Sequence, residues 1–195
     1  MVNDVAKNEI YDLTTDRPQL KNVIVGAGWR PEMYEGGQEI DVDLSCFLLN
    51  PMDLTREDED FVFYNNTDSE ANGVHHKGDN RTGVGEGDDE IIFIDLSKVD
   101  YEISSIVFVA SIYEGAQRGQ DFSQVKDAYI RIYDEDNKEE IMRFDLAEDF
   151  AGEQAVKIGA LERMGNSWSF KAIGEPIKGG LGKIAETYGL MIVPS

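Results

Sequence analysis

Short apolar segments with a two-residue period set the strongest constraint on how this chain can fold. Residues 40–49 alternate between apolar and polar side chains, which is the period of a strand with one face on a core. Only residues 181–188 have helical spacing, and Gly189 follows them as a stop. Other runs rich in β-branched and aromatic residues lie at 21–25, 61–64, 90–96, 103–113, 128–133, 141–146, 155–163 and 168–173. About nine strands and one helix predict a mostly β fold, a β-sandwich of two antiparallel sheets with a short C-terminal helix.

The length of 195 residues is that of one domain, which can bury enough surface to fold without a disulfide or a metal ion. We expect a single sandwich domain over residues 21–195. Residues 1–20 are predicted to form a loosely ordered N-terminal segment, because they begin with a polar stretch.

The charge balance excludes several classes of partner. The chain has 18 Lys and Arg against 39 Asp and Glu, a formal net charge of −21. A nucleic-acid binder needs a basic surface, so no nucleic-acid partner is expected. A cation or a basic partner remains attractive. The lack of a long apolar run and of a signal-peptide core, together with the single Cys46, predicts a reduced, cytoplasmic location.

The densest group of carboxylates lies in residues 78–90, where five acids and three glycines at alternate positions precede an apolar strand. Repulsion among these acids destabilises the fold unless a cation lies between them. Hard oxygen ligands favour Ca²⁺ or Mg²⁺, and glycines let backbone carbonyls converge on a Ca²⁺ ion. Arg81 and Val84 stand where an EF-hand loop needs a ligand and a glycine, which excludes that motif.

A second acidic group precedes the alternating strand. Glu39, Asp41 and Asp43 share one strand face, with neighbouring Cβ atoms about 7 Å apart. Beside residues 78–90 they could complete one or two Ca²⁺ sites. The alternative reading is an acidic, solvated surface without a metal.

These segments resemble the TerD-like tellurite-resistance and stress-protein family. Residues 78–83 leading into 87–90 resemble its acidic signature, and residues 40–49, 60–66, 118–125, 179–181 and 185–189 resemble its other motifs in order. The resemblance covers about residues 20–190. It implies a Ca²⁺-binding, non-enzymatic β-sandwich in a cytosolic bacterial protein, with other stress-resistance proteins as partners at the membrane surface.

By position in those motifs, the resemblance places the acidic metal site on carboxylates, with an amide, a longer carboxylate and a glycine carbonyl as further ligands. These residues are Asp41, Asp43, Asp79, Asp88, Asp89 and Glu90, followed by Asn80, Glu86 and Gly85. Glu86 stands where the family commonly has Asp, and residues 1–20 differ from the short strand with which its members usually begin.

Two other functions compete with this interpretation. Acidic loops on a sandwich also suit a Ca²⁺-dependent lipid- or ligand-binding module. A metal-assisted hydrolase is disfavoured because no nucleophile and base stand out. Of the remaining candidates, His75 and His76 are expected in an exposed loop, Cys46 as a buried small hydrophobe, and residues 178–183 as a plain helix entry.

Overall fold

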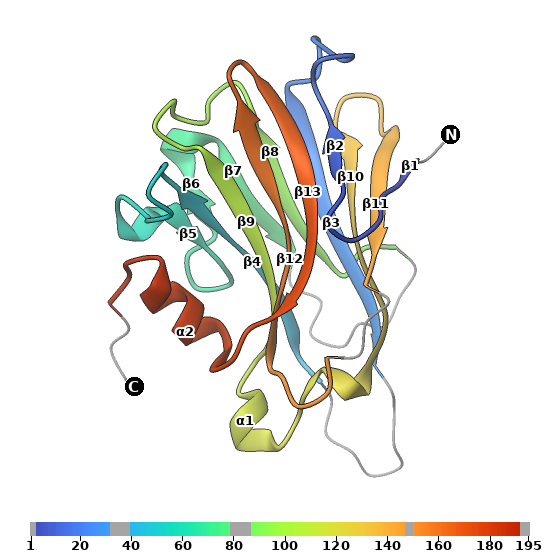
Figure 1. Cartoon of the computed structure of the whole chain (residues 1–195), viewed down its shortest axis with the longest axis vertical. Coiled ribbons are helices and arrows are strands. Elements are labelled where there is room, and N and C mark those ends of the chain that lie inside the picture. Colours follow the sequence, from blue (N-terminus) through green and yellow to red (C-terminus); the bar gives the residue numbers. More distant parts are fainter. Residues whose placement is uncertain (1–2, 32–39, 79–86, 147–149, 192–195) are drawn as a thin grey trace.

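Two β-sheets pack face to face in the computed structural model of the chain (Figure 1). The structure describes residues 3–31, 40–78, 87–146 and 150–191. The seven-stranded sheet has the order β1 (Asn3–Asp4), β11 (Glu140–Asp145), β10 (Val125–Asp134), β3 (Asn22–Pro31), β8 (Glu90–Asp95), β7 (Val74–Gly78), β6 (Asp68–Ser69). The six-stranded sheet has the order β2 (Ile10–Asp12), β13 (Ser167–Pro176), β12 (Ala155–Met164), β9 (Ser105–Ile112), β4 (Val42–Leu49), β5 (Phe61–Val62).

The β-sandwich prediction is confirmed, and so is the C-terminal helix α2 (Gly180–Thr187). All strand pairs are antiparallel except that of β1 with β11. The shorter elements are the helix α1 (Gly115–Arg118) and the 3₁₀ turns η1 (Asp58–Asp60), η2 (Glu70–Asn72) and η3 (Phe122–Gln124). No helix among the described residues is long and apolar enough to cross a membrane.

Strand alternation produces the core between the sheets. In β4, Val42, Leu44 and Cys46 face the opposite sheet and are buried, as the period of the sequence predicts. The other face of β4 is also buried, because Phe47 and Leu49 pack in a second apolar cluster under α2. Like its neighbour β9, β4 is therefore buried on both faces and lies between the inter-sheet core and the outer layer.

The first twenty residues differ from the expectation of loose order. Residues 3–4 pair with β11 and residues 10–12 pair with β13, so the segment adds an edge strand to each sheet. Val5, Leu13 and Leu20 are buried in the core between the sheets. Burial of these three apolar side chains is what orders the segment.

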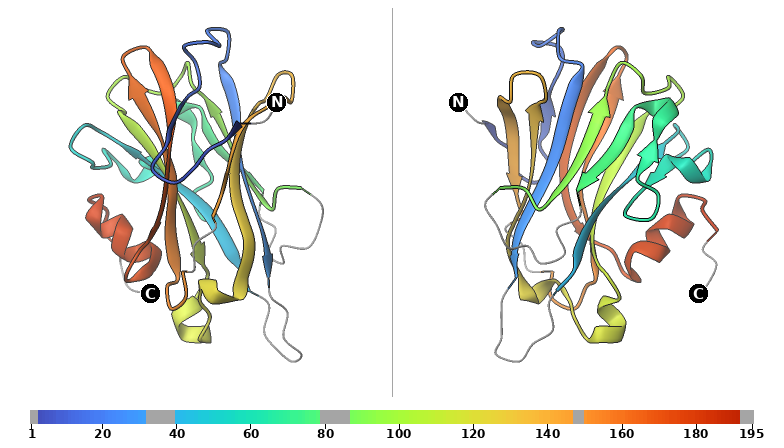
Figure 2. Two further views of the ribbon diagram at one scale, coloured as in Figure 1. Left: turned by 45° about the vertical axis from the view of Figure 1, so that its right-hand side comes forward. Right: turned by 180° about the vertical axis from the view of Figure 1, so that it is seen from behind.

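One end of the sandwich gathers the acidic segments. β3 ends and β4 begins toward the lower end in Figure 1, and β7 ends and β8 begins nearer mid-height, below the hairpin between β10 and β11; the rotated views in Figure 2 agree. The hairpin between β10 and β11 lies at the opposite end (Figure 2). The topology therefore brings the two predicted acidic groups to the same end of the fold.

Candidate metal site

The structure describes five of the nine predicted metal ligands: Asp41, Asp43, Asp88, Asp89 and Glu90. The other four, Asp79, Asn80, Gly85 and Glu86, lie outside the described residues.

Glu90 is the first residue of β8 and points into the space between the sheets, where its side chain is 1% exposed. His76 Nε2 lies 2.7 Å from Glu90 Oε2 and 3.2 Å from the backbone oxygen of Leu44 in the other sheet. Burial lowers the pKa of His76, but the hydrogen bond and charge of Glu90 outweigh it and the net pKa is raised. The raised pKa favours the charged form of His76 beside the buried Glu90 carboxylate.

This ion pair corrects the expectation of an exposed histidine loop. His75 and His76 lie in strand β7, and only His75 reaches the surface, where its Nδ1 is 2.6 Å from Asp68 Oδ1. The alternation of β7 turns His76 inward beside the core residue Val74. Burial of an imidazole is tolerated here because Glu90 stabilises its charged form.

Asp89 is buried where the chain enters β8. Its Oδ2 accepts a hydrogen bond of 2.9 Å from the backbone N–H of Trp29, and its own N–H donates to the carbonyl of Ala27 at 2.8 Å. These two bonds hold the end of the acidic segment against β3.

Asp88 lies on the outer face of the seven-stranded sheet, away from Glu90. Its side chain is 2% exposed and accepts from Arg131 Nε at 2.7 Å, from Arg131 Nη2 at 3.0 Å and from the Tyr129 hydroxyl at 2.9 Å. Gly26 leaves the space for this carboxylate, because a Cβ at that position would overlap it. Burial and the charge of Asp88 raise the pKa of Tyr129 to about 12.

Asp41 and Asp43 lie at the start of β4, and Asp43 is 5% exposed. Burial raises the pKa of Tyr64, and the negative charges of Asp43, Asp41 and Glu114 raise it further. The charge of Asp43 also contributes to the raised pKa of His76. Acids from both sheets thus act on the same few groups at this end of the sandwich.

Within the described ranges, no three His, Cys, Asp or Glu side chains converge closely enough to hold a metal ion. The described acids instead form pairs, with Glu90 on His76 and Asp88 on Arg131. Sequence reasoning missed the partners Arg131, Tyr129 and His76. One signal in the sequence could have indicated the position of Asp88. In β3, Gly26 alternates with the core residues Val25 and Ala27, so it lies on the outer face and leaves room there for a side chain from a neighbouring strand.

A comparison with known proteins identifies the family. The TerD domain profile matches residues 1–188. The chain belongs to the TerD domain family. General stress protein 16U of Bacillus subtilis is 44% identical over 98% of this chain and 100% of the relative. Tellurium resistance protein TerD of Serratia marcescens is 42% identical over 95% of this chain and 96% of the relative.

The fold of this TerD family member also resembles solved structures. A homologue of telluride resistance protein (TerD) from Streptomyces coelicolor A3(2) superposes with a TM-score of 0.66 over 85% of this chain and 95% of that chain. At 16% identity this likeness shows the shared sandwich alone. Membership of the TerD family places the chain among tellurite-resistance and stress-response proteins.

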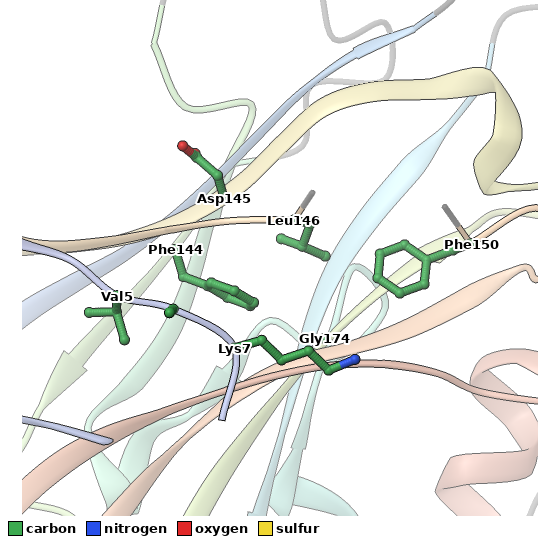
Figure 3. A pocket seen from close by; sticks show the side chains of 8 residues that line it. Val5, Lys7, Phe144, Asp145, Leu146, Phe150 and Gly174 are labelled. Carbon is green, nitrogen blue, oxygen red and sulfur yellow. The ribbon is translucent and has the colours of Figure 1, made fainter. Parts of the chain in front are cut away.

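A separate cavity of about 250 Å³ lies at the sheet edge beside β1, β11 and β13 (Figure 3). Phe144, Leu146 and Phe150 converge there, and the side chain of Lys7 runs past Gly174. Its wall is mainly apolar, with one carboxylate, Asp145, drawn at its rim (Figure 3). Such a lining is unsuited to a bare divalent cation, which needs several oxygens.

Proposed function

We propose that this TerD family member is a non-enzymatic Ca²⁺-binding stress-response protein, in which the cation orders the acidic end of the sandwich for partner proteins. One observation carries the proposal. His76 in β7 lies 2.7 Å from the Glu90 carboxylate in β8 and 3.2 Å from the backbone oxygen of Leu44 in β4, so the acids at the start of β4 and of β8 meet at one end of the sandwich. Negative charge is therefore concentrated where residues 79–86, with two more acids, join β7 to β8.

The donor chemistry favours Ca²⁺. Carboxylates and glycine carbonyls are hard oxygen donors, which suit Ca²⁺ better than zinc or copper. Asp41 and Asp43 lie on either side of Val42, the first residue of β4, and Asp89 and Glu90 lead into β8 a few residues after the segment 79–86. In the proposal these four acids, with Asp79, Asn80, Glu86 and the carbonyl of Gly85, bind one or two Ca²⁺ ions; Asp43 on the outer face of β4 and Glu90 between the sheets do not share an ion.

Asp88 has a different role in the proposal. Arg131 and Tyr129 already occupy its carboxylate, so its negative charge is compensated on the outer face. We therefore treat Asp88 as the residue that anchors the exit of the acidic segment rather than as a primary ligand. In the proposal, bound Ca²⁺ neutralises the ligand carboxylates and orders the acidic end of the sandwich, and it takes part in no reaction.

The proposed location and partners follow from the same features. The one cysteine, Cys46, is buried in the core, which suits a reduced cytoplasmic environment. Other stress-resistance proteins, gathered at the membrane surface, are the proposed partners of the loaded state.

Calorimetric titration of the EDTA-stripped protein with Ca²⁺, with Mg²⁺ as competitor and a thermal melt alongside, tests the proposal. At a hundred-fold excess over Kd, binding stabilises the fold by about 2.7 kcal/mol. For a chain of this size that corresponds to a rise in Tm of about 5–10 °C.

Matched variants locate the site. Asp43→Asn should reduce the heat of binding and most of the rise in Tm. Glu139→Gln removes one exposed carboxylate from the hairpin at the opposite end and should leave both unchanged. Absence of heat in the unmodified protein, or equal losses in the two variants, would reject a Ca²⁺ site at the acidic end.

A further inference from the structure

A row of aromatic rings crosses the outer layer of the six-stranded sheet. The ring of Phe61 stacks on Phe47 and on Phe63, with centroids 4.3 Å apart in each pair. Tyr64 continues the row edge-on to Phe63 at 5.1 Å, and Tyr113 follows at 5.7 Å. The row lies on the side of the sheet that α2 covers (Figure 1).

The row forms one wall of a cavity of about 290 Å³ between β5 and the chain that follows α2. Phe63 is only half-buried, so its ring contributes aromatic surface at this cavity. The residues that line the cavity are Phe61, Phe63, Asn66, Leu190, Met191, Asp58 and Glu59. An aromatic wall beside two carboxylates is the arrangement that binds organic cations.

The two carboxylates at the cavity lie outside the ion pairs of the described residues. Asp58 and Glu59 are exposed in η1, and neither forms an ion pair with any described residue. The neighbouring Arg56 is directed elsewhere, because its guanidinium donates to the buried Asp60 at 2.9 Å and also faces Asp100. The cavity therefore has a negative edge that the described chain does not compensate.

Elsewhere this chain repeatedly places arginine on aromatic rings. Arg143 lies 3.7 Å from the ring centroid of Tyr129, Arg163 lies 4.4 Å from that of Trp168, and Arg118 lies 5.2 Å from that of Tyr113. None of the described lysines or arginines lies over Phe61 or Phe63. The cavity thus has an aromatic ring and carboxylates, the two kinds of group that bind a guanidinium, and no described arginine of this chain occupies it.

Exposed apolar side chains surround this position. Met191, which lines the cavity, is 93% exposed, and Leu54, also exposed, packs beside Gly189 just before the cavity. Methionine side chains adapt to partners of different shape, and a patch of this kind marks an interaction surface.

We propose that this surface binds a basic, partly apolar segment of a partner protein, with one arginine side chain inserted between Phe63 and the carboxylates of Asp58 and Glu59. Arginine suits the site better than lysine, because its planar guanidinium stacks on a ring and forms two hydrogen bonds with carboxylates. The net charge of −21 attracts such a segment at long range and accelerates its association. The proposal is independent of Ca²⁺ binding, since none of these residues belongs to the acidic end.

The test uses a short capped peptide of leucine and arginine, and a control peptide in which neutral, isosteric citrulline replaces each arginine. Both are titrated into the ¹⁵N-labelled full chain in EDTA and again in Ca²⁺. The arginine peptide should shift amide signals of residues 58–66 and 189–191 in both buffers. The citrulline peptide should bind at least about five-fold more weakly, the change expected for loss of the cation–π and ionic contacts.

Two variants separate the site from the overall charge. Asp58→Asn with Glu59→Gln changes two exposed side chains and should weaken the arginine peptide by about five-fold. Asp136→Asn with Glu139→Gln removes the same charge from the distant hairpin and should leave Kd within about a factor of two.

A third variant tests the aromatic wall. Phe63→Leu keeps an apolar side chain and should weaken binding by about three-fold. Equal weakening in the two double variants, equal binding of the two peptides, or shifts confined to other surfaces would overturn the proposal. If Phe63→Leu does not fold, the comparison of the two double variants decides alone.

Discussion

Replacing Arg131 by methionine tests how the acidic segment is anchored. Methionine keeps most of the aliphatic stem but removes both donors to Asp88, whose side chain is 2% exposed. Removing one partner of a buried ion pair costs about 3–5 kcal/mol, because the other charge is left without compensation. Arg131 itself is 27% exposed and the Tyr129 hydroxyl still donates to Asp88, so we expect the lower end, about 3 kcal/mol.

The companion variant Asp88→Asn should cost less, about 1–2 kcal/mol. The guanidinium of Arg131 remains partly hydrated and still has Glu140 at 2.8 Å. The double variant should then lose less than the sum of the single variants, with a coupling of about 1–2 kcal/mol. Urea unfolding at constant pH in EDTA measures the free energy of unfolding of the unmodified protein, the two single variants and the double variant. An unchanged m-value shows that the variants differ in stability and not in the surface exposed on unfolding.

Salt gives an independent check, since a buried pair is screened much less than a surface pair. The coupling between Arg131 and Asp88 should therefore persist at high ionic strength. A loss below about 1 kcal/mol for Arg131→Met, or additive single effects, would refute the assignment of a buried anchor.

Three further predictions follow from particular contacts. Gly26→Ala should destabilise the fold by at least about 2 kcal/mol in urea unfolding, because its Cβ would overlap the Asp88 carboxylate, whereas Gly182→Ala in α2 meets no described atom and should be neutral or stabilising. Asp121→Ala removes the capping box of η3 and should cost about 1 kcal/mol. Hydrogen bonds to Ser123 lower the pKa of Asp121, so its contribution is full above the unfolded pKa and is lost as pH falls through the folded pKa. Burial raises the pKa of Cys46, so a thiol reagent should label it only after unfolding.

The strand pattern of the sheets could be predicted because burial imposes a strict period. The alternation of residues 40–49 and the two hairpins, β10 with β11 and β12 with β13, all correspond to strands in the structure. The edge strands β1 and β2 were missed, because two or three residues cannot show a period and each strand depends on a partner more than a hundred residues away.

The candidate site was predicted less completely, for a geometric reason. Position in the sequence suggests that Asp88, Asp89 and Glu90 act together, since they are consecutive. The hydrogen bond from the Asp89 N–H to Ala27 marks the place where the backbone changes course, so Asp88 turns to the outer face and Glu90 to the interior. Composition indicates a charged loop, but only tertiary partners such as Arg131 decide which charges are already compensated.

The two proposed sites should act almost independently, although the aromatic row links their positions. Asp43 and Phe47 are four residues apart on one face of β4, a separation of about 13 Å, and Phe47 stacks on Phe61 beside the arginine cavity. A divalent cation and a unit charge at that distance interact by about 0.6 kcal/mol in water, and screening by physiological salt reduces this several-fold. Loading the acidic end with Ca²⁺ should therefore change the Kd of the arginine peptide by less than about two-fold. A larger change would require a conformational link, and the paired strands β4 and β9, both buried on two faces, are the elements that join the two positions.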